Sequence, residues 1–146
     1  MYIDIFIKEY PFRARLITNP DDKEVRNEQV LYAMDDSAEY SANTKDCVEP
    51  IDILFIDTID GYDRINQIYP NCPVSKDNQD IIHYRGIGRF ILKLPANTCH
   101  IYGIKEGDEV YFNETHHPDD KYLVSILFCS ISLIAILCHF FAVKPI

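Results

Sequence analysis

The longest run without a charged side chain, residues 122–143 (YLVSILFCSISLIAILCHFFAV), constrains the fold more than any other part of this sequence. At ~1.5 Å per residue, a helix over this run matches the ~30 Å hydrocarbon core of a bilayer. We therefore predict a transmembrane helix at 122–143, a juxtamembrane linker at 116–121 and a cytosolic domain at 1–115. The chain is then a single-pass, tail-anchored membrane protein with its soluble domain on the cytoplasmic side.

Two serines of the predicted helix, Ser125 and Ser132, are seven residues apart and therefore lie on one helix face. Small polar residues let two helices approach closely in a membrane and share hydrogen bonds. This face is a candidate for packing against another transmembrane helix. The partners predicted on this basis are an integral membrane protein complex and the surrounding lipid bilayer.

The formal net charge is −9, from 23 acidic and 14 basic side chains. Such a balance opposes diffuse attraction to phosphate backbones, so nucleic acid is not the expected partner. The first residues, MYIDIFIKEYPFRAR, alternate in polarity, whereas a secretory signal has a basic stretch followed by an apolar core. We therefore predict a reducing cytoplasmic compartment without a disulfide framework.

Alternating apolar residues predict strands at 3–7 and 12–17, which could form a hairpin, and a further strand at 51–58. Thr18 or Asn19 followed by Pro20 is typical of a helix start, which predicts a helix reaching about Ala33. A polar loop is expected over 35–50 and one or two helical turns over 62–68. The predicted fold class is α+β, a small barrel-like β domain with short helices, plus the one C-terminal transmembrane helix.

Residues 85–112, RGIGRFILKLPANTCHIYGIKEGDEVYF, predict a strand, a short helix, a left-handed glycine at Gly103, a tight turn and a return strand. This pattern resembles the AbrB/SpoVT/MazE swapped-hairpin family and the related double-psi barrels. Members form intertwined homodimers, and many bind DNA through basic residues on and before the first strand. The resemblance implies that Arg85, Arg89 and Lys93 contact nucleic acid or a partner.

One unit of this kind cannot bury its own apolar face. We expect it to pair with the N-terminal strands of the same chain, residues 3–17, because a long N-terminal region precedes it. A swapped homodimer is the alternative.

The sequence shows no Gly-rich phosphate loop, nucleophile elbow, paired general acid and base, or Cys-x-x-Cys site. We predict that the protein is not an enzyme and holds no cofactor or resident metal. The predicted function is that of an accessory or regulatory subunit docked on a larger membrane complex. One alternative is a membrane-tethered AbrB-like DNA-binding regulator or antitoxin. Another is a thiol-based or metal-based redox sensor that uses Cys47, Cys72 and Cys99.

Overall fold

The computed structural model describes residues 1–19, 22, 28–76 and 80–113, which fall within one compact unit, Met1–Glu114. In these residues the chain forms seven strands and one short helix. They are β1 (Tyr2–Ile7), β2 (Tyr10–Ile17), β3 (Val30–Ala42), β4 (Ile51–Ile59), β5 (Tyr62–Cys72), β6 (Tyr84–Pro95), α1 (Thr98–Tyr102) and β7 (Val110–Asn113).

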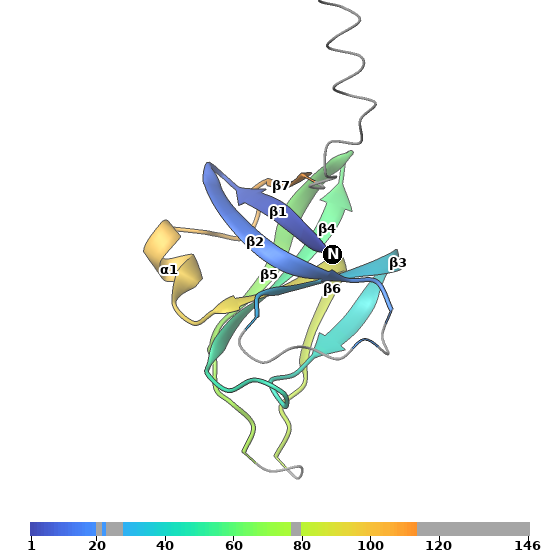
Figure 1. The fold of residues 1–146 in the computed structure, drawn as a ribbon. Helices are drawn as coiled ribbons and strands as arrows, with labels where there is room; N and C mark the ends of the chain where they lie inside the picture. Colours follow the sequence, from blue (N-terminus) through green and yellow to red (C-terminus); the bar gives the residue numbers. More distant parts are fainter. Residues whose placement is uncertain (20–21, 23–27, 77–79, 114–146) are drawn as a thin grey trace, which may run out of the picture. The chain divides into compact units, whose positions relative to one another are not determined.

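The strands form one sheet in the order β5-β4-β6-β3-β2-β1-β7, and the sheet curls strongly (Figure 1). Each neighbouring pair is antiparallel except β2 and β3, which run parallel. The two end strands meet, because Arg64 on β5 and Glu109 beside β7 form an isolated bridge. There the amide of Ile65 donates to the Asp108 carbonyl at 3.0 Å, and the amide of Gly107 donates to the Ile65 carbonyl at 2.7 Å. The curled sheet therefore closes on itself at one short seam.

The main core lies on the concave side of the sheet, where alternate residues of each strand point inward. Half of its members are aliphatic side chains without solvent exposure. They include Ile5, Ile7, Leu31, Leu54, Ile56 and Leu92.

A second, smaller core lies on the opposite face of β4 and β6, around Ile53, Phe55 and Ile91. It is covered by an antiparallel ribbon formed by the second half of β3 and the first half of β6, residues 38–42 and 84–88. The ribbon approaches β4 closely. A Cβ on Gly88 would lie 2.6 Å from the carbonyl oxygen of Ile56, and one on Gly86 would lie 2.4 Å from the Phe55 ring.

A buried carboxylate connects three parts of this fold. Asp52, near the start of β4, has no solvent exposure. Its Oδ1 accepts hydrogen bonds from the amides of Asn71 at 2.8 Å and Asn97 at 3.2 Å, and its Oδ2 accepts one from the amide of Cys99 at 2.9 Å. These bonds hold the end of β5 and the start of α1 against β4.

The predicted α+β class is wrong, because the described residues are mostly strand and include a single helix of five residues. The segment 62–68, predicted as helical turns, belongs to β5. Its apolar residues Ile65 and Ile68 are three apart, a helix-like spacing. The register between β4 and β5 shifts next to Asn66, and such a bulge brings residues three apart onto the same face.

The predicted helix ending near Ala33 is wrong over residues 30–33, while its residues 20–21 and 23–27 lie outside the described ranges. The predicted loop at 35–50 is confirmed for residues 43–50 and wrong for residues 35–42. Residues 30–33 form the first part of β3, and the strand continues to Ala42. Its register against β6 is interrupted between Ala33 and Ala38. This irregularity contains Asp35, Asp36 and Ser37, which gave the segment its loop-like composition.

Within the described ranges, no helix has the length and apolar character needed to cross a bilayer. The predicted span at 122–143, the linker at 116–121, and Ser125 and Ser132 all lie outside those ranges. The transmembrane helix of the predicted class is therefore not part of the fold that the structure describes.

Several local predictions are confirmed. β1 and β2 form the predicted hairpin, Gly103 ends α1 in the left-handed region with φ 62°, and Gly107 has φ 89° in the tight turn. β7 pairs with β1 of the same chain, as expected, whereas β6 pairs with β3 and β4 rather than with the N-terminal hairpin.

Replacing Asp52 with Ala should lower the free energy of unfolding by at least about 3 kcal/mol, because three buried amides lose their shared acceptor. Asp52→Asn should cost less, since one amide oxygen remains. Asp80 is exposed, so Asp80→Ala should change stability by less than about 0.5 kcal/mol. Urea unfolding of the three variants measures these differences, and an Asp52→Ala protein within about 1 kcal/mol of the parent would contradict the assigned role.

Gly88→Ala should destabilise the fold by about 1–3 kcal/mol, because the new methyl group overlaps the backbone of Ile56. Ile87→Val is the matched control, since the Ile87 side chain is 51% exposed and loses one methylene. Thermal unfolding should separate the two variants by several degrees. Equal midpoints would show that β4 and β6 can move apart at this crossing without cost.

Candidate ligand pocket beside Lys93

Lys93 is the one lysine among the buried residues of the described ranges, with 8% of its surface exposed. It lies on β6, opposite Val30 of β3 and Ile53 of β4. Residues directly opposite in antiparallel strands share a face. Lys93 therefore projects to the outer face of the sheet, on the side of the second core. Its Nζ lies 5.3 Å from the centre of the Tyr32 ring, within the range of a cation–π contact.

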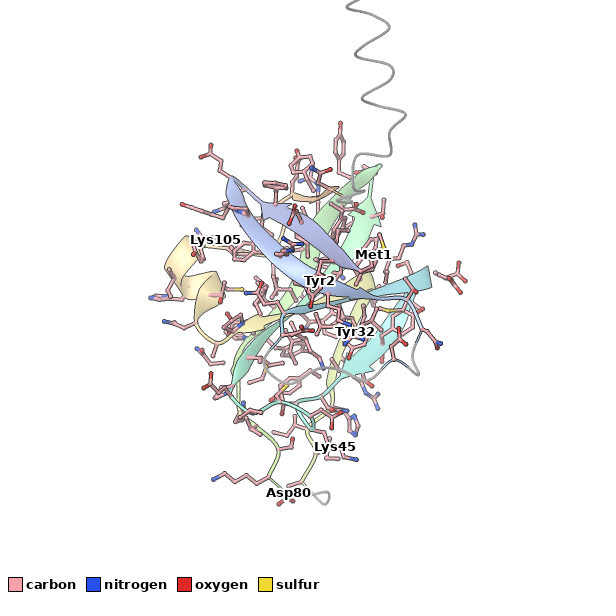
Figure 2. The ribbon with its side chains drawn as sticks, in the orientation of Figure 1. Met1, Tyr2, Tyr32, Lys45, Asp80 and Lys105 are labelled. Atoms are coloured by element: carbon pink, nitrogen blue, oxygen red, sulfur yellow. The ribbon has the colours of Figure 1, made fainter. Side chains whose placement is uncertain are left out.

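A cavity of about 620 Å³ opens beside this pair. It forms where β2 leaves the sheet, because β2 pairs with only the first part of β3, up to Ile17 and Tyr32. One wall is therefore the end of β2 with Thr18 and Asn19, and the floor contains Tyr32, Ile91 and Lys93. Figure 2 labels Tyr32 on β3, between Tyr2 and Lys45 in that view.

The opposite wall is the irregular part of β3. Between Ala33 and Ala38 the strand pulls away from β6, and Met34, Asp35 and Asp36 line the cavity. Two hydrogen bonds hold this excursion. The Arg89 Nε donates to the Met34 carbonyl at 3.3 Å, and the Tyr40 hydroxyl donates to the Asp36 carbonyl at 2.9 Å. The wall is thus a fixed feature of the strand, as bulges near functional sites commonly are.

The cavity has a mixed electrostatic character. Three exposed aspartates, Asp35, Asp36 and Asp46, line it together with the single cation of Lys93. The described residues contain no cluster of three or more His, Cys, Asp or Glu side chains arranged to hold a metal ion. Carboxylate oxygens accept hydrogen bonds and an ammonium group donates them, so the lining contains both kinds of polar group.

A smaller cavity of about 100 Å³ lies on the other side of Lys93 and also shares Asp46 with the first. Glu28 and Gln29 line it. Each has one buried side-chain oxygen, Oε2 and Oε1 respectively, with no hydrogen-bond donor among the described residues. Buried acceptors are normally satisfied, so these two oxygens mark a place where a donor can be added.

The structure separates the three basic residues selected from the sequence. Arg85 is exposed and lies 3.8 Å from a Glu39 carboxylate oxygen. Arg89 is exposed but bonded to the Met34 carbonyl, and Lys93 is buried at the cavity. They share a face of β6, yet they do not form one continuous basic surface.

The three candidate thiols are also in different surroundings. Cys72 and Cys99 are buried and Cys47 is half-buried, and none of them forms a disulfide. Burial, followed by the nearby Asp52 carboxylate and its hydrogen bond, raises the pKa of Cys99 to about 12. Burial also raises the pKa of Cys72. Because the thiolate is the reactive form, this geometry favours Cys47 over the other two as a reactive thiol.

The sequence reasoning selected Lys93 for its basic charge and missed the residues around it. Tyr32, Asp35, Asp36 and Asp46 lie in segments predicted as helix or loop. The local signal that could have marked the site is the order ILKL, which places a lysine within an apolar run of a predicted strand.

Alkylation should distinguish the three thiols. At pH 8, iodoacetamide should modify Cys47 at least about tenfold faster than Cys72 or Cys99. Because the pKa of Cys99 is about 12, its thiolate fraction at pH 8 is roughly a thousandth of that of an ordinary cysteine with a pKa of 9.0. Peptide mass spectrometry of the full chain gives the rates, and the same reaction in 8 M urea is the control in which all three should react alike. Rapid modification of Cys72 or Cys99 in the folded protein would contradict this assignment.

No family model matches this sequence, and no curated protein matches it. Two solved structures share the fold. One, from Sinorhizobium meliloti 1021, is described as "a putative transcription regulator"; it is 21% identical, with a TM-score of 0.57, over 76% of this chain and 92% of that one. The other, from Novosphingobium aromaticivorans DSM 12444, is a protein of unknown function; it is 17% identical, with a TM-score of 0.51, over 75% of this chain and 83% of that one. At these identities the likeness establishes the fold alone.

Proposed function

We propose that residues 1–113 form a non-enzymatic regulatory module that binds a small polar molecule in the cavity beside Lys93. The observation that carries this proposal is a buried lysine, stacked on Tyr32, at the floor of a cavity of about 620 Å³. Ligand sites commonly occupy 300–1,000 Å³ and combine apolar walls with a few convergent polar groups. An ammonium group at the wall of a cavity can donate hydrogen bonds to a polar molecule there.

A regulatory role is supported by two features. The two hydrogen bonds of the β3 wall, from Arg89 to the Met34 carbonyl and from Tyr40 to the Asp36 carbonyl, join side chains to backbone and do not pair a nucleophile with a general base. In addition, the Sinorhizobium meliloti protein that shares this fold is described as "a putative transcription regulator". A ligand in contact with the β3 excursion would change the surface that carries Asp35 and Asp36, which is a direct route to a regulated partner contact.

The accessory-subunit prediction is compatible with this module, because a ligand-binding domain can report to a partner. Docking on an integral membrane complex stays a prediction. The DNA-binding alternative has less support, since Arg85 faces Glu39, Arg89 bonds to a backbone carbonyl and Lys93 is buried. Phosphate recognition needs several accessible cations on one surface.

The test is a thermal-shift screen of the full chain against neutral sugars, amino acids, choline, carboxylates, nucleotides and inorganic phosphate. At 100 times the dissociation constant, a ligand stabilises the folded state by about 2.7 kcal/mol, which corresponds to a rise of several degrees. Lys93→Met should abolish the ligand-dependent rise. Lys105→Met is the matched control and should retain it, because Lys105 lies on an exposed turn. A screen in which no class shifts the midpoint, or a shift that survives in Lys93→Met, would refute the proposed function.

A further inference from the structure

The mixed lining of the Lys93 cavity also restricts the class of its ligand, and this step rests on the proposed function. An anionic ligand would have to pass or adjoin three aspartates, Asp35, Asp36 and Asp46. Like charges in a partly enclosed site repel, and the single cation of Lys93 does not balance three carboxylates. Phosphates, nucleotides and dicarboxylates are therefore disfavoured.

A simple organic cation is disfavoured for a different reason. Tyrosine rings attract cations to their faces, and carboxylates nearby would assist. Here, however, the cation next to the Tyr32 ring is the protein's own, since the Lys93 Nζ lies 5.3 Å from the ring centre. A ligand ammonium group entering this floor would meet a like charge at close range.

A neutral ligand with many hydroxyl groups fits the remaining chemistry. Each hydroxyl can donate to a carboxylate and accept from an ammonium or amide group. The cavity offers both kinds of partner, with the three aspartates as acceptors, Lys93 as a donor, and Asn19 and Asn43 able to act as either. The apolar surface of Tyr32 and Ile91 gives the floor a place for the C–H face of a sugar ring.

The smaller cavity adds an independent observation. Glu28 and Gln29 line it, and each keeps a buried acceptor oxygen that no described residue satisfies. Lys93 and Asp46 line both cavities, so a ligand bonded to these two residues would lie next to the smaller one. Hydroxyl donors of a ligand would supply what these oxygens lack, whereas carboxylate or phosphate oxygens would not.

We propose that the ligand is a neutral carbohydrate of one or two sugar rings, held by hydroxyl bonds to Asp46 and Lys93 and by contact with Tyr32. The binding is non-covalent. The volume of about 620 Å³ accommodates a ligand of this size.

The test is titration of the full chain with glucose, galactose, N-acetylglucosamine, maltose and cellobiose. The readout is tyrosine fluorescence, which is accessible because the sequence contains no tryptophan. At least one sugar should bind saturably, and Lys93→Met and Asp46→Asn should each weaken that binding at least tenfold. Asp46 is exposed, so Asp46→Asn tests the site without threatening the core, and Asp80→Asn at another exposed position should leave binding unchanged.

Glycine, glutamate, choline and inorganic phosphate are the competing probes. If one of them binds in a Lys93-dependent manner and no sugar does, the carbohydrate assignment is overturned while the ligand-binding function stands. If no probe binds, both fall. Sugar binding that is indifferent to both Lys93→Met and Asp46→Asn would place the sugar elsewhere and overturn the proposal.

Discussion

The Asp52 carboxylate is the interaction on which the arrangement of this domain depends most directly. A buried carboxylate is expensive unless its oxygens are hydrogen-bonded, and here three backbone amides meet that requirement. The donors come from residues 71, 97 and 99, which lie far from Asp52 in sequence. The three hydrogen bonds to this carboxylate hold the end of β5, the start of α1 and the start of β4 together. β6, which runs into α1, is thereby positioned, and Lys93 with it.

The sequence predicted the parts of the fold that are governed by local rules. Alternation located β1, β2 and β4, and glycines at positive φ located the end of α1 and the following turn. The prediction from sequence failed where pairing with a neighbouring strand determines the spacing of apolar and polar residues. The bulge beside Asn66 gave β5 a helix-like spacing, and the polar excursion in β3 imitated a loop. Bulges depend on the partner strand, which single-sequence periodicity does not contain.

The candidate site was also predictable only where local rules apply. Lys93 was selected from the sequence, but as an exposed contact residue rather than as a buried one. Alternation correctly places it on the face opposite the main core. What alternation cannot show is that the ribbon of residues 38–42 and 84–88 covers that face. Gly86 and Gly88 permit this covering because their backbones approach β4 more closely than any side chain would allow. The second layer turns an apparently solvent-facing strand surface into the floor of a cavity.

The seam between β5 and β7 is the line along which the closed sheet should open most easily. Six neighbouring strand pairs are joined by ladders, whereas β5 meets the segment before β7 through one isolated bridge and the backbone bonds of Ile65 with Asp108 and Gly107. Side chains add the Arg64–Glu109 ion pair at 3.2 Å, a bond from Arg64 to the Gly107 carbonyl and one from the Ile68 amide to Glu106. An exposed ion pair contributes little and weakens as ionic strength rises. The ring can therefore part at this line without breaking a ladder, and the amides of Ile65 and Gly107 should exchange with solvent hydrogen sooner than those of β4 and β6. The cavity lies along β2, β3 and β6, so this opening would leave the proposed ligand contacts in place.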